Sequence, residues 1–321
     1  MNNILTVCIP TLDRPIYLLR ALKSILEFEK FNNFINICIS DNASTLEYKE
    51  VEEYIKTKTS WRITYIKQKV RLSIDENMFY VVNMAQSEYV FLLGDDDLFI
   101  SKDLQSLQHF VLDAKPDLAI FNSKVIDENG KYVKNHFKLK PQEYKTLESA
   151  FLDLRDKGTY GSILVKTKHL NEQYFKALFG TAHAYGCYWL SILNSERDNV
   201  KIFIPDFQCT FLTAGQKHYN YLTVYYRDIL FEIAVYKRYV TTDKGHLLSN
   251  LFERKYNKMI ISVSFLTKLL QNNIDIDTIK SINPMIYNSL SFRLNYLLSL
   301  GIVNLKLYAL IKKIYNVLNR K

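Results

Sequence analysis

Three successive carboxylates, Asp95, Asp96 and Asp97, follow Gly94 and the apolar run 89–93. An apolar run that ends at a glycine indicates a buried strand whose carboxyl end opens into a cleft. Adjacent carboxylates repel one another, so a protein that gathers them at a strand end commonly supplies a cation. A divalent metal is the first interpretation and a bound phosphate the second, because hard cations hold substrate phosphates through one or two carboxylates. The alternative is a solvated acidic turn.

The residues before this loop alternate between strand and helix patterns. Apolar and β-branched runs predict strands at 3–9, 36–40, 62–67 and 89–93. Apolar residues at helical spacing predict helices at 16–28, 46–56 and 75–86. Such alternation is typical of a parallel sheet with helices on both faces, in which ligands bind beyond the carboxyl ends of the strands. The loops at 10–14, 41–44 and 94–97 are therefore expected to meet in one cleft.

Two later segments carry local signals of their own. Asn129-Gly130 predicts the turn of a hairpin. The run 158–165, which contains two glycines, predicts a further strand.

Three motifs carry a resemblance to a known family: CIPTLDR at 8–14, ISDNAS at 39–44 and EYVFLLGDDD at 88–97. In this order they resemble the nucleotide-sugar domain of family-2 glycosyltransferases, and the LLGDDD ending is similar to one branch of that family. The resemblance implies the GT-A fold, a Rossmann-like, mostly parallel sheet flanked by helices. It also implies inverting transfer of a sugar from a nucleotide-diphosphate donor, UDP-sugar first, to a glycan or lipid-linked acceptor in bacterial surface polysaccharide synthesis.

The resemblance assigns donor-binding roles to Pro10, Thr11, Leu12, Asp41, Asn77, Asp95 and Asp96. The backbone of 10–12 would border the nucleoside, Asp41 would hydrogen-bond the base, and Asp95 would face the ribose. Asp97 would ligate Mn²⁺ or Mg²⁺ on the diphosphate, where the metal acts as a Lewis acid, and Asp96 would share either role. The alternative for Asp41 is a helix cap. The chain has neither GxGxxG nor GxxxxGK[ST], so metal and side chains must meet the phosphate charge.

The acceptor half departs from the family pattern. Where the family usually has an acidic pair whose aspartate is the catalytic base, this chain has Ala182 and His183 before a predicted helix at 184–194. A neutral imidazole can take a proton from an acceptor hydroxyl at pH 7, so His183 is predicted as the base. A structural hydrogen-bonding role at the helix start is the alternative, and Asp153 and Asp156 are the reserve candidates.

Two further polar residues are placed by the resemblance. His218 stands where GT-A enzymes often have a histidine that completes the metal or diphosphate site, and Lys217 beside it could reach the diphosphate. A solvent-facing basic loop is the alternative. The helix at 75–86 opens with Asp75 and Asn77 in place of the family's usual Gly-x-x-x-Ala-Arg-Asn start, and Asn77 is expected to pack near the aspartate loop.

The excess positive charge lies in the C-terminal third. Residues 222–321 hold 15 of the 42 Lys and Arg but 6 of the 33 Asp and Glu, which accounts for the whole net charge of +9. We expect a GT-A domain at 1–220, with donor half 1–125 and acceptor half 126–220, and a helical basic region at 221–321. In 302–321, apolar residues at helical spacing alternate with Lys and Arg, which predicts a basic amphipathic helix. Such a helix would bind an anionic membrane surface or form a homo-oligomer. No nucleic-acid-binding motif is present.

The remaining features predict a cytoplasmic protein, peripheral on the inner face of the plasma membrane. Four cysteines, Cys8, Cys38, Cys187 and Cys209, lie in apolar contexts without CxxC spacing and are expected to be buried, reduced thiols. Neither a signal peptide nor an apolar run of about 18 residues is found. Two other classes stay open: a nucleotidyltransferase, which would also use paired aspartates and metal, and a membrane-bound scaffold without turnover.

Overall fold

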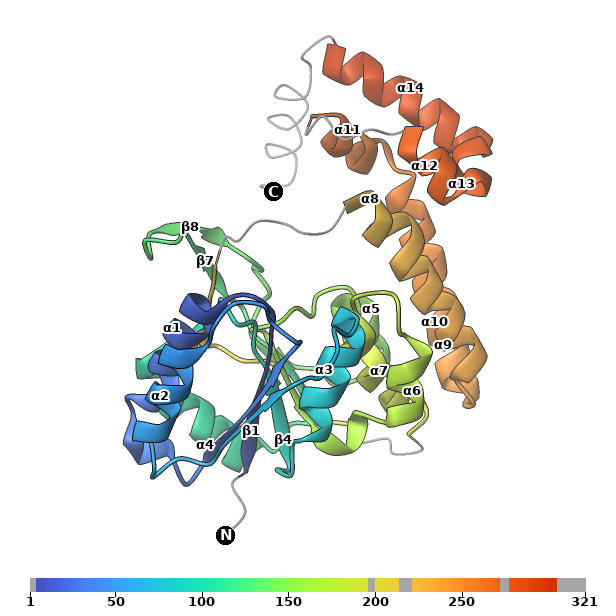
Figure 1. Cartoon of the computed structure of the whole chain (residues 1–321). Helices are drawn as coiled ribbons and strands as arrows, with labels where there is room; N and C mark the ends of the chain where they lie inside the picture. The colour runs from blue at the N-terminus through green and yellow to red at the C-terminus, as the bar shows by residue number, and fades with distance from the viewer. Residues whose placement is uncertain (1–3, 196–199, 214–220, 272–276, 305–321) are drawn as a thin grey trace. The chain divides into compact units, whose positions relative to one another are not determined.

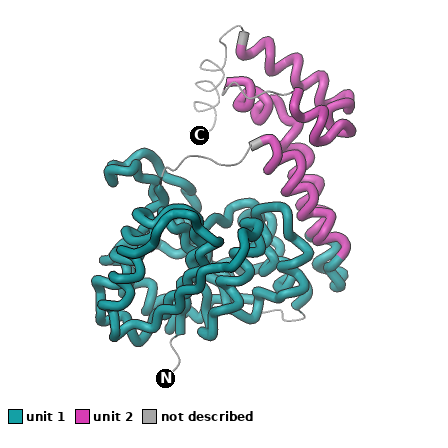
Figure 2. Tube along the Cα trace, in the orientation of Figure 1, with its two compact units in different colours: residues 1–216, 239–248 teal, residues 217–238, 249–321 magenta. Residues whose placement is uncertain are grey.

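The computed structural model describes residues 4–195, 200–213, 221–271 and 277–304. It divides into two compact units (Figure 2). Unit 1 is made of residues 1–216 and 239–248, and unit 2 of residues 217–238 and 249–321. The chain therefore enters unit 2 twice, and the single division predicted at residue 220 stays a prediction.

Unit 1 is built on an eight-stranded sheet in the order β3-β2-β1-β4-β10-β6-β11-β9 (Figure 1). Four parallel strands make one half: β1 (Leu5–Thr11), β2 (Ile35–Asp41), β3 (Ile63–Lys67) and β4 (Tyr89–Leu92). The other strands are β6 (Leu118–Ile120), β9 (Gln142–Glu143), β10 (Ile163–Lys166) and β11 (Ile202–Ile204). β10 is antiparallel to both β4 and β6, so the sheet is mixed beyond its parallel half. The predicted α/β class with a large central sheet is confirmed.

Helices connect and cover the strands of unit 1. They are α1 (Pro15–Leu26), α2 (Lys49–Thr57), α3 (Ile74–Asn83), α4 (Leu104–Ala114), α5 (Leu147–Leu154), α6 (Glu172–Ala177) and α7 (Cys187–Leu193). Short 3₁₀ turns are η1 (Glu29–Phe31), η2 (Ser101–Asp103), η3 (Thr167–His169) and η4 (Ala184–Gly186). Local sequence explains two starts: Pro15 occupies the first turn of α1, and Ser73 with Glu76 forms a capping box at α3.

A second, four-stranded sheet has the order β5-β12-β7-β8. Its strands are β5 (Leu98–Phe99), β7 (Lys124–Ile126), β8 (Tyr132–Asn135) and β12 (Thr210–Thr213). β7 and β8 form the hairpin predicted from Asn129-Gly130, and Gly130 adopts φ +79° in its turn. β5 and β12 were not predicted from the sequence. β12 brings Thr213 to the aspartate loop.

Three predicted elements differ in extent from the observed ones. The strand predicted at 158–165 begins at Ile163, because 158–162 form a turn in which Gly161 has φ +73°. The helix predicted at 184–194 opens as η4 and continues as α7. The helix predicted at 46–56 begins at Lys49.

Unit 2 is helical, as predicted. Its helices are α8 (Tyr221–Thr223), the π turn η5 (Val224–Asp228), α9 (Ile229–Tyr239), α10 (Asp243–Ile260), α11 (Val263–Gln271), α12 (Asp277–Ile282), α13 (Pro284–Asn288) and α14 (Leu290–Asn304). The end of α9 and the start of α10 belong to unit 1. Most of the amphipathic helix predicted at 302–321 lies outside the described residues.

Two predictions about the interior and the membrane can be compared with the structure. All four cysteines are buried free thiols, as expected from their apolar contexts. Among the helices that the structure describes, none combines the length and apolar character needed to cross a bilayer.

Candidate functional site

The loops that follow β1, β2 and β4 are joined by direct contacts. Thr11 Oγ1, at the end of β1, donates a hydrogen bond of 2.8 Å to Asp95 Oδ2. The backbone N of Asp13 donates to Ser44 Oγ at 2.8 Å, and Asp13 Oδ1 accepts from the backbone N of Thr45 at 2.6 Å. These contacts confirm the predicted convergence of the three loops at the carboxyl ends of parallel strands.

Arg14 forms salt bridges with both Asp95 and Asp96. No role was assigned to Arg14 from the sequence. Its Nη1 lies 3.0 Å from Asp95 Oδ1 and 2.9 Å from Asp96 Oδ2, so one nitrogen bridges both side chains. The guanidinium carbon also lies 5.1 Å from the centre of the Tyr17 ring. The sequence did hint at this role, because Arg14 lies in TLDRP between the end of a strand and the first proline of a helix, where its side chain can reach the edge of the sheet.

Asp97 points away from Arg14 toward β12. Its Oδ1 accepts from the backbone N of Thr213 at 3.1 Å. A Cβ added at Gly94 or at Gly161 would lie 2.8 Å from Asp97 Oδ2, so both glycines allow the backbone to approach this carboxylate closely. Main chain from three segments, at Gly94, Gly161 and Thr213, lies against Asp97, and the residue is only 6% exposed.

Burial and the neighbouring charge of Asp96 change the titration of Asp95 and Asp97. Burial, followed by the charge of Asp96, raises the pKa of Asp95 to about 6, and Arg14 opposes this rise. The same two causes, burial and Asp96, raise the pKa of Asp97 well above its ordinary value. An additional cation would stabilise the ionised forms of these side chains.

Among the described residues, Asp97 is the carboxylate of this loop that has no ion-pair partner and could ligate a hard divalent cation. Within the described ranges, no ion pair to Asp97 is recorded, and no three His, Cys, Asp or Glu side chains are grouped to hold a metal. The predicted second ligand, His218, lies outside the described residues together with Lys217. A single protein carboxylate suits Mg²⁺ or Mn²⁺ when substrate phosphates and water complete the shell.

Asp41 is fully buried at the end of β2, opposite Thr11 in the parallel register. Its Oδ1 accepts from the backbone N of Ser44 at 2.9 Å, and its Oδ2 accepts from Tyr65 Oη at 2.8 Å. The helix-cap alternative is wrong, because α2 begins at Lys49, with Tyr48 in the N-cap position. Each carboxylate oxygen can accept a further hydrogen bond, so the predicted base-binding role stays open.

Asn77 is linked to β2. Its Oδ1 accepts from Ser40 Oγ at 2.7 Å, and its Nδ2 donates to the Ser40 carbonyl at 3.1 Å. Both of these hydrogen bonds go to Ser40, which precedes Asp41 in the chain. The sequence had instead predicted that Asn77 packs near the aspartate loop. A donor-binding role for Asn77 remains a prediction.

His183 directly precedes η4. Its backbone N donates to Thr181 Oγ1 at 3.0 Å, and its ring centre lies 6.1 Å from that of Tyr185. Burial, followed by the charge of Arg155, lowers the pKa of His183 to about 4, so the imidazole is neutral at pH 7. Tyr185 Oη in turn donates to the carbonyl of Gly158 at 3.2 Å, in the turn that places Gly161 against Asp97.

The reserve candidates for the base lie at the surface. Asp156 is exposed and pairs with Lys157 at 2.8 Å. Asp153 is also exposed, and Tyr144 Oη lies 3.5 Å from its Oδ2. The carboxylates of Asp153 and Asp156 are both in contact with solvent, whereas the His183 imidazole is largely removed from it.

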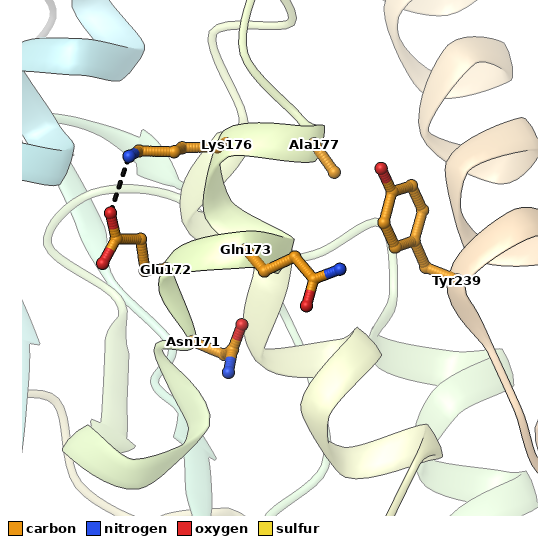
Figure 3. Close-up of a pocket in the computed structure, with 6 residues that line it drawn as sticks. All are labelled: Asn171, Glu172, Gln173, Lys176, Ala177 and Tyr239. Atoms are coloured by element: carbon orange, nitrogen blue, oxygen red, sulfur yellow. Dashed lines mark hydrogen bonds and ion pairs between the residues drawn. The ribbon is translucent and has the colours of Figure 1, made fainter.

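An open pocket of about 660 Å³ lies elsewhere on unit 1 (Figure 3). It is lined by Asn171, Glu172, Gln173, Lys176, Ala177 and Tyr239. Figure 3 shows the Tyr239 ring across from Gln173, with Lys176 paired to Glu172 at 2.6 Å. None of the site residues predicted from the sequence lines it.

Comparison with known proteins places this geometry in a family. The model of "Glycosyl transferase family 2" matches residues 6–178. The abequosyltransferase RfbV of Salmonella typhimurium is 36% identical over 121 residues, 38% of this chain and 36% of that protein. The GalNAc(5)-diNAcBac-PP-undecaprenol beta-1,3-glucosyltransferase of Campylobacter jejuni is 26% identical over 177 residues, 53% of this chain and 56% of that protein. The matches thus span little more than a third to a half of these relatives.

A solved structure supports the fold over almost the whole chain. S. aureus TarS 1–349 in complex with UDP aligns with a TM-score of 0.62 and 13% sequence identity, covering 94% of this chain and 92% of that chain. The likeness confirms the predicted GT-A fold with its helical C-terminal region.

Replacing Arg14 tests the account of the carboxylate cluster. We expect Arg14→Gln to lower the free energy of unfolding by about 1–3 kcal/mol, because two largely buried carboxylates lose a charged hydrogen-bond donor. Chemical denaturation at pH 7 measures the change. Arg20→Gln, on the helix α1 that follows Arg14, is the matched control and should stay within about 0.5 kcal/mol of wild type. Equal stability of the two variants would contradict the account.

Proposed function

The chain belongs to glycosyl transferase family 2, and we propose that it transfers a sugar from a nucleoside-diphosphate donor, UDP-sugar first, to a hydroxyl of a glycan or lipid-linked saccharide. The observation that carries this proposal is the contact of Thr11 and Arg14 with Asp95 at the carboxyl ends of β1 and β4. Ligands of α/β sheets bind at this edge. The abequosyltransferase and undecaprenol-linked activities in the relatives' names support bacterial surface polysaccharide synthesis. The UDP bound to TarS supports a UDP-sugar donor.

We propose that the donor nucleoside lies along the loops after β1 and β2. The backbone of 10–12 borders it, and Asp41 accepts a hydrogen bond from an N–H of the base. Tyr65 and Ser44 already hold the Asp41 carboxylate in one orientation, which lowers the entropy lost when a base binds. Asp95, fixed by Thr11 and Arg14, faces the ribose hydroxyls with Asp96 beside it. Asn77, which bonds to Ser40, contributes from the Asp41 side.

We propose that Asp97 holds Mn²⁺ or Mg²⁺ at the diphosphate, with His218 as the second protein ligand. When bound, the cation neutralises the charge that develops on the leaving diphosphate. The Thr213 amide orients the Asp97 carboxylate, and Gly94 and Gly161 leave its Oδ2 uncovered by side chains of their own.

His183 supplies the base in this proposal. Its neutral imidazole takes the proton of the acceptor hydroxyl while the hydroxyl oxygen forms a bond to the anomeric carbon. The bond between that carbon and the diphosphate oxygen breaks at the same time, with the electron pair leaving on the diphosphate. Displacement from the opposite face inverts the anomeric centre.

Asp97→Asn tests the metal assignment. We expect the variant to lose about 100-fold or more of the Mn²⁺-dependent release of nucleoside diphosphate, because an amide is a weaker ligand for a hard cation than a carboxylate. The assay uses a panel of UDP- and GDP-sugars with glycan and lipid-linked acceptors. Asp113→Asn, an exposed carboxylate on α4, is the control. Undiminished turnover in Asp97→Asn would refute the assignment, and pyrophosphate release from NTP and sugar phosphate would indicate a nucleotidyltransferase.

His183→Gln tests the base. We expect kcat to fall about 10²- to 10⁴-fold while donor affinity changes little. A base must be unprotonated, so the lowered pKa of His183, about 4, gives the wild-type pH profile no acid limb of its own near 6.5. A limb near pH 6 belongs to Asp95 and should persist in His183→Gln. His109→Gln, on the exposed face of α4, is the control. Turnover within tenfold of wild type would remove His183 as the base.

We also propose that unit 2 contacts an anionic membrane surface through α14, in keeping with a lipid-linked acceptor. Four leucines on one face of α14 are strongly exposed: Leu290 (72%), Leu294 (53%), Leu297 (63%) and Leu298 (60%). The opposite face is packed, since Phe292 and Ser299 are buried and Asn295 Nδ2 donates to the Ile261 carbonyl at 2.8 Å.

The charge of unit 2 favours a membrane over a second copy of the chain. Its described residues include nine Lys and Arg but four Asp and Glu. Like charges would oppose pairing of two such units, whereas anionic lipid attracts them. An apolar helix face with basic surroundings is the usual composition of an interfacial helix.

Substitution on this face tests the membrane proposal. We expect the double variant Leu294→Gln, Leu298→Gln to bind phosphatidylglycerol vesicles about tenfold more weakly or worse, because two apolar side chains no longer insert. Co-sedimentation measures binding, with phosphatidylcholine vesicles as the lipid control and Leu247→Gln on α10 as the protein control. Unchanged binding would contradict the proposal. A wild-type dimer that the double variant abolishes would assign the face to a homo-oligomer.

A further inference from the structure

Asp75 gathers four backbone amides from one distant loop. The residue lies in the first turn of α3 and is 1% exposed. Its Oδ2 accepts from the N–H groups of Gly180 (2.8 Å), Thr181 (3.1 Å) and Ala182 (3.0 Å). Its Oδ1 accepts from the N–H of Ala184 at 3.1 Å. The mechanism proposed above gives Asp75 no role, although this loop carries His183.

The loop 180–184 needs such an acceptor. Gly180 has φ +93° and Ala182 has φ +58°, so the chain turns through the left-handed region twice and no regular ladder satisfies its amides. Buried unpaired N–H groups are costly, and a carboxylate satisfies several of them at once with charge-assisted hydrogen bonds. Without Asp75, the loop would lose its partner for consecutive amides on both sides of the strained Ala182.

Capping of α3 does not require Asp75. Ser73 Oγ accepts from the backbone N of Glu76 at 3.2 Å, and the Glu76 carboxylate accepts from the backbone N of Ser73 at 2.8 Å. This capping box already satisfies the start of the helix. The four hydrogen bonds of Asp75 therefore serve the loop, and the positive end of the helix dipole favours the negative charge there.

α3 also contacts the residues just before the loop 180–184 through its apolar face, and it contacts β2 through Asn77. One turn after Asp75, the ring of Phe79 packs edge-on against Phe175 at 5.5 Å and Phe179 at 5.9 Å. On its other side, Asn77 bonds to Ser40, next to Asp41. α3 is thus a rigid connection between the strand end proposed for the nucleoside and the loop of His183.

We propose that Asp75 is a positioning residue for the acceptor side of the reaction. By holding the backbone of 180–184, it fixes the point at which the His183 imidazole meets the acceptor hydroxyl. It does so at the loop where the family usually carries its acidic base. The inference rests on the proposed glycosyl transfer, and it adds a residue that acts through His183 without touching substrate.

Asp75→Asn tests this inference, because an amide group must present N–H toward at least one of the four donors. We expect kcat to fall about 10- to 100-fold, since small displacements of reacting groups cost this much, while donor Kd stays within about twofold. Hydrogen exchange measured by mass spectrometry should show faster exchange at 180–184. The matched control is Glu76→Gln, the same change one residue along the same turn, which should leave kcat and this exchange within about twofold.

Two outcomes would overturn the inference. The first is exchange at 180–184 that is no faster in Asp75→Asn than in Glu76→Gln. The second is a kcat that falls no further than in that control, or that falls only with the folded fraction measured by circular dichroism. If the wild-type protein transfers no sugar from any donor, the proposed function fails, and the exchange comparison still decides whether Asp75 holds the loop.

Discussion

Repulsion among three adjacent carboxylates is the constraint on which the site depends. Asp95, Asp96 and Asp97 end one buried strand, and burial raises the pKa of both Asp95 and Asp97. The protein answers the first two with a single guanidinium from Arg14, at the end of the neighbouring strand. It surrounds the third with main chain, which leaves Asp97 as the carboxylate whose charge a further cation would best compensate.

The fold follows from this requirement because every group that meets the carboxylates comes from a strand end or a turn beside one. Parallel pairing of β1 with β2 and β4 places Thr11, Asp41 and the aspartate loop at one edge of the sheet. Antiparallel β10 returns the chain beside β4, so that Gly161 approaches Asp97 from the other side. α3 then connects this edge to the loop 180–184 through Asn77 and Asp75.

Local patterns predicted the parallel half of the sheet, and long-range contacts account for what they missed. β4 and the Asn129-Gly130 hairpin carry strong local signals, an apolar run and an obligatory turn residue, and both were found as predicted. The contact of Thr213 with Asp97 joins residues more than a hundred positions apart, through a strand too short for a periodic pattern. The hydrogen bonds of Asp75 also join residues more than a hundred positions apart. They could not be predicted from the sequence, because the residues around Asp75 resemble an ordinary first turn of a helix.

The central claim is that the edge formed by Arg14, Asp41 and Asp97 binds a nucleoside diphosphate together with a divalent cation. The most direct measurement is the melting temperature with UDP, CDP, GDP and ADP, each with Mn²⁺ and with a chelator, since a ligand that binds the native state raises it by mass action. One nucleotide should raise it by several degrees with Mn²⁺ and much less with the chelator. No shift with any nucleotide, or a shift independent of the cation, would contradict the claim.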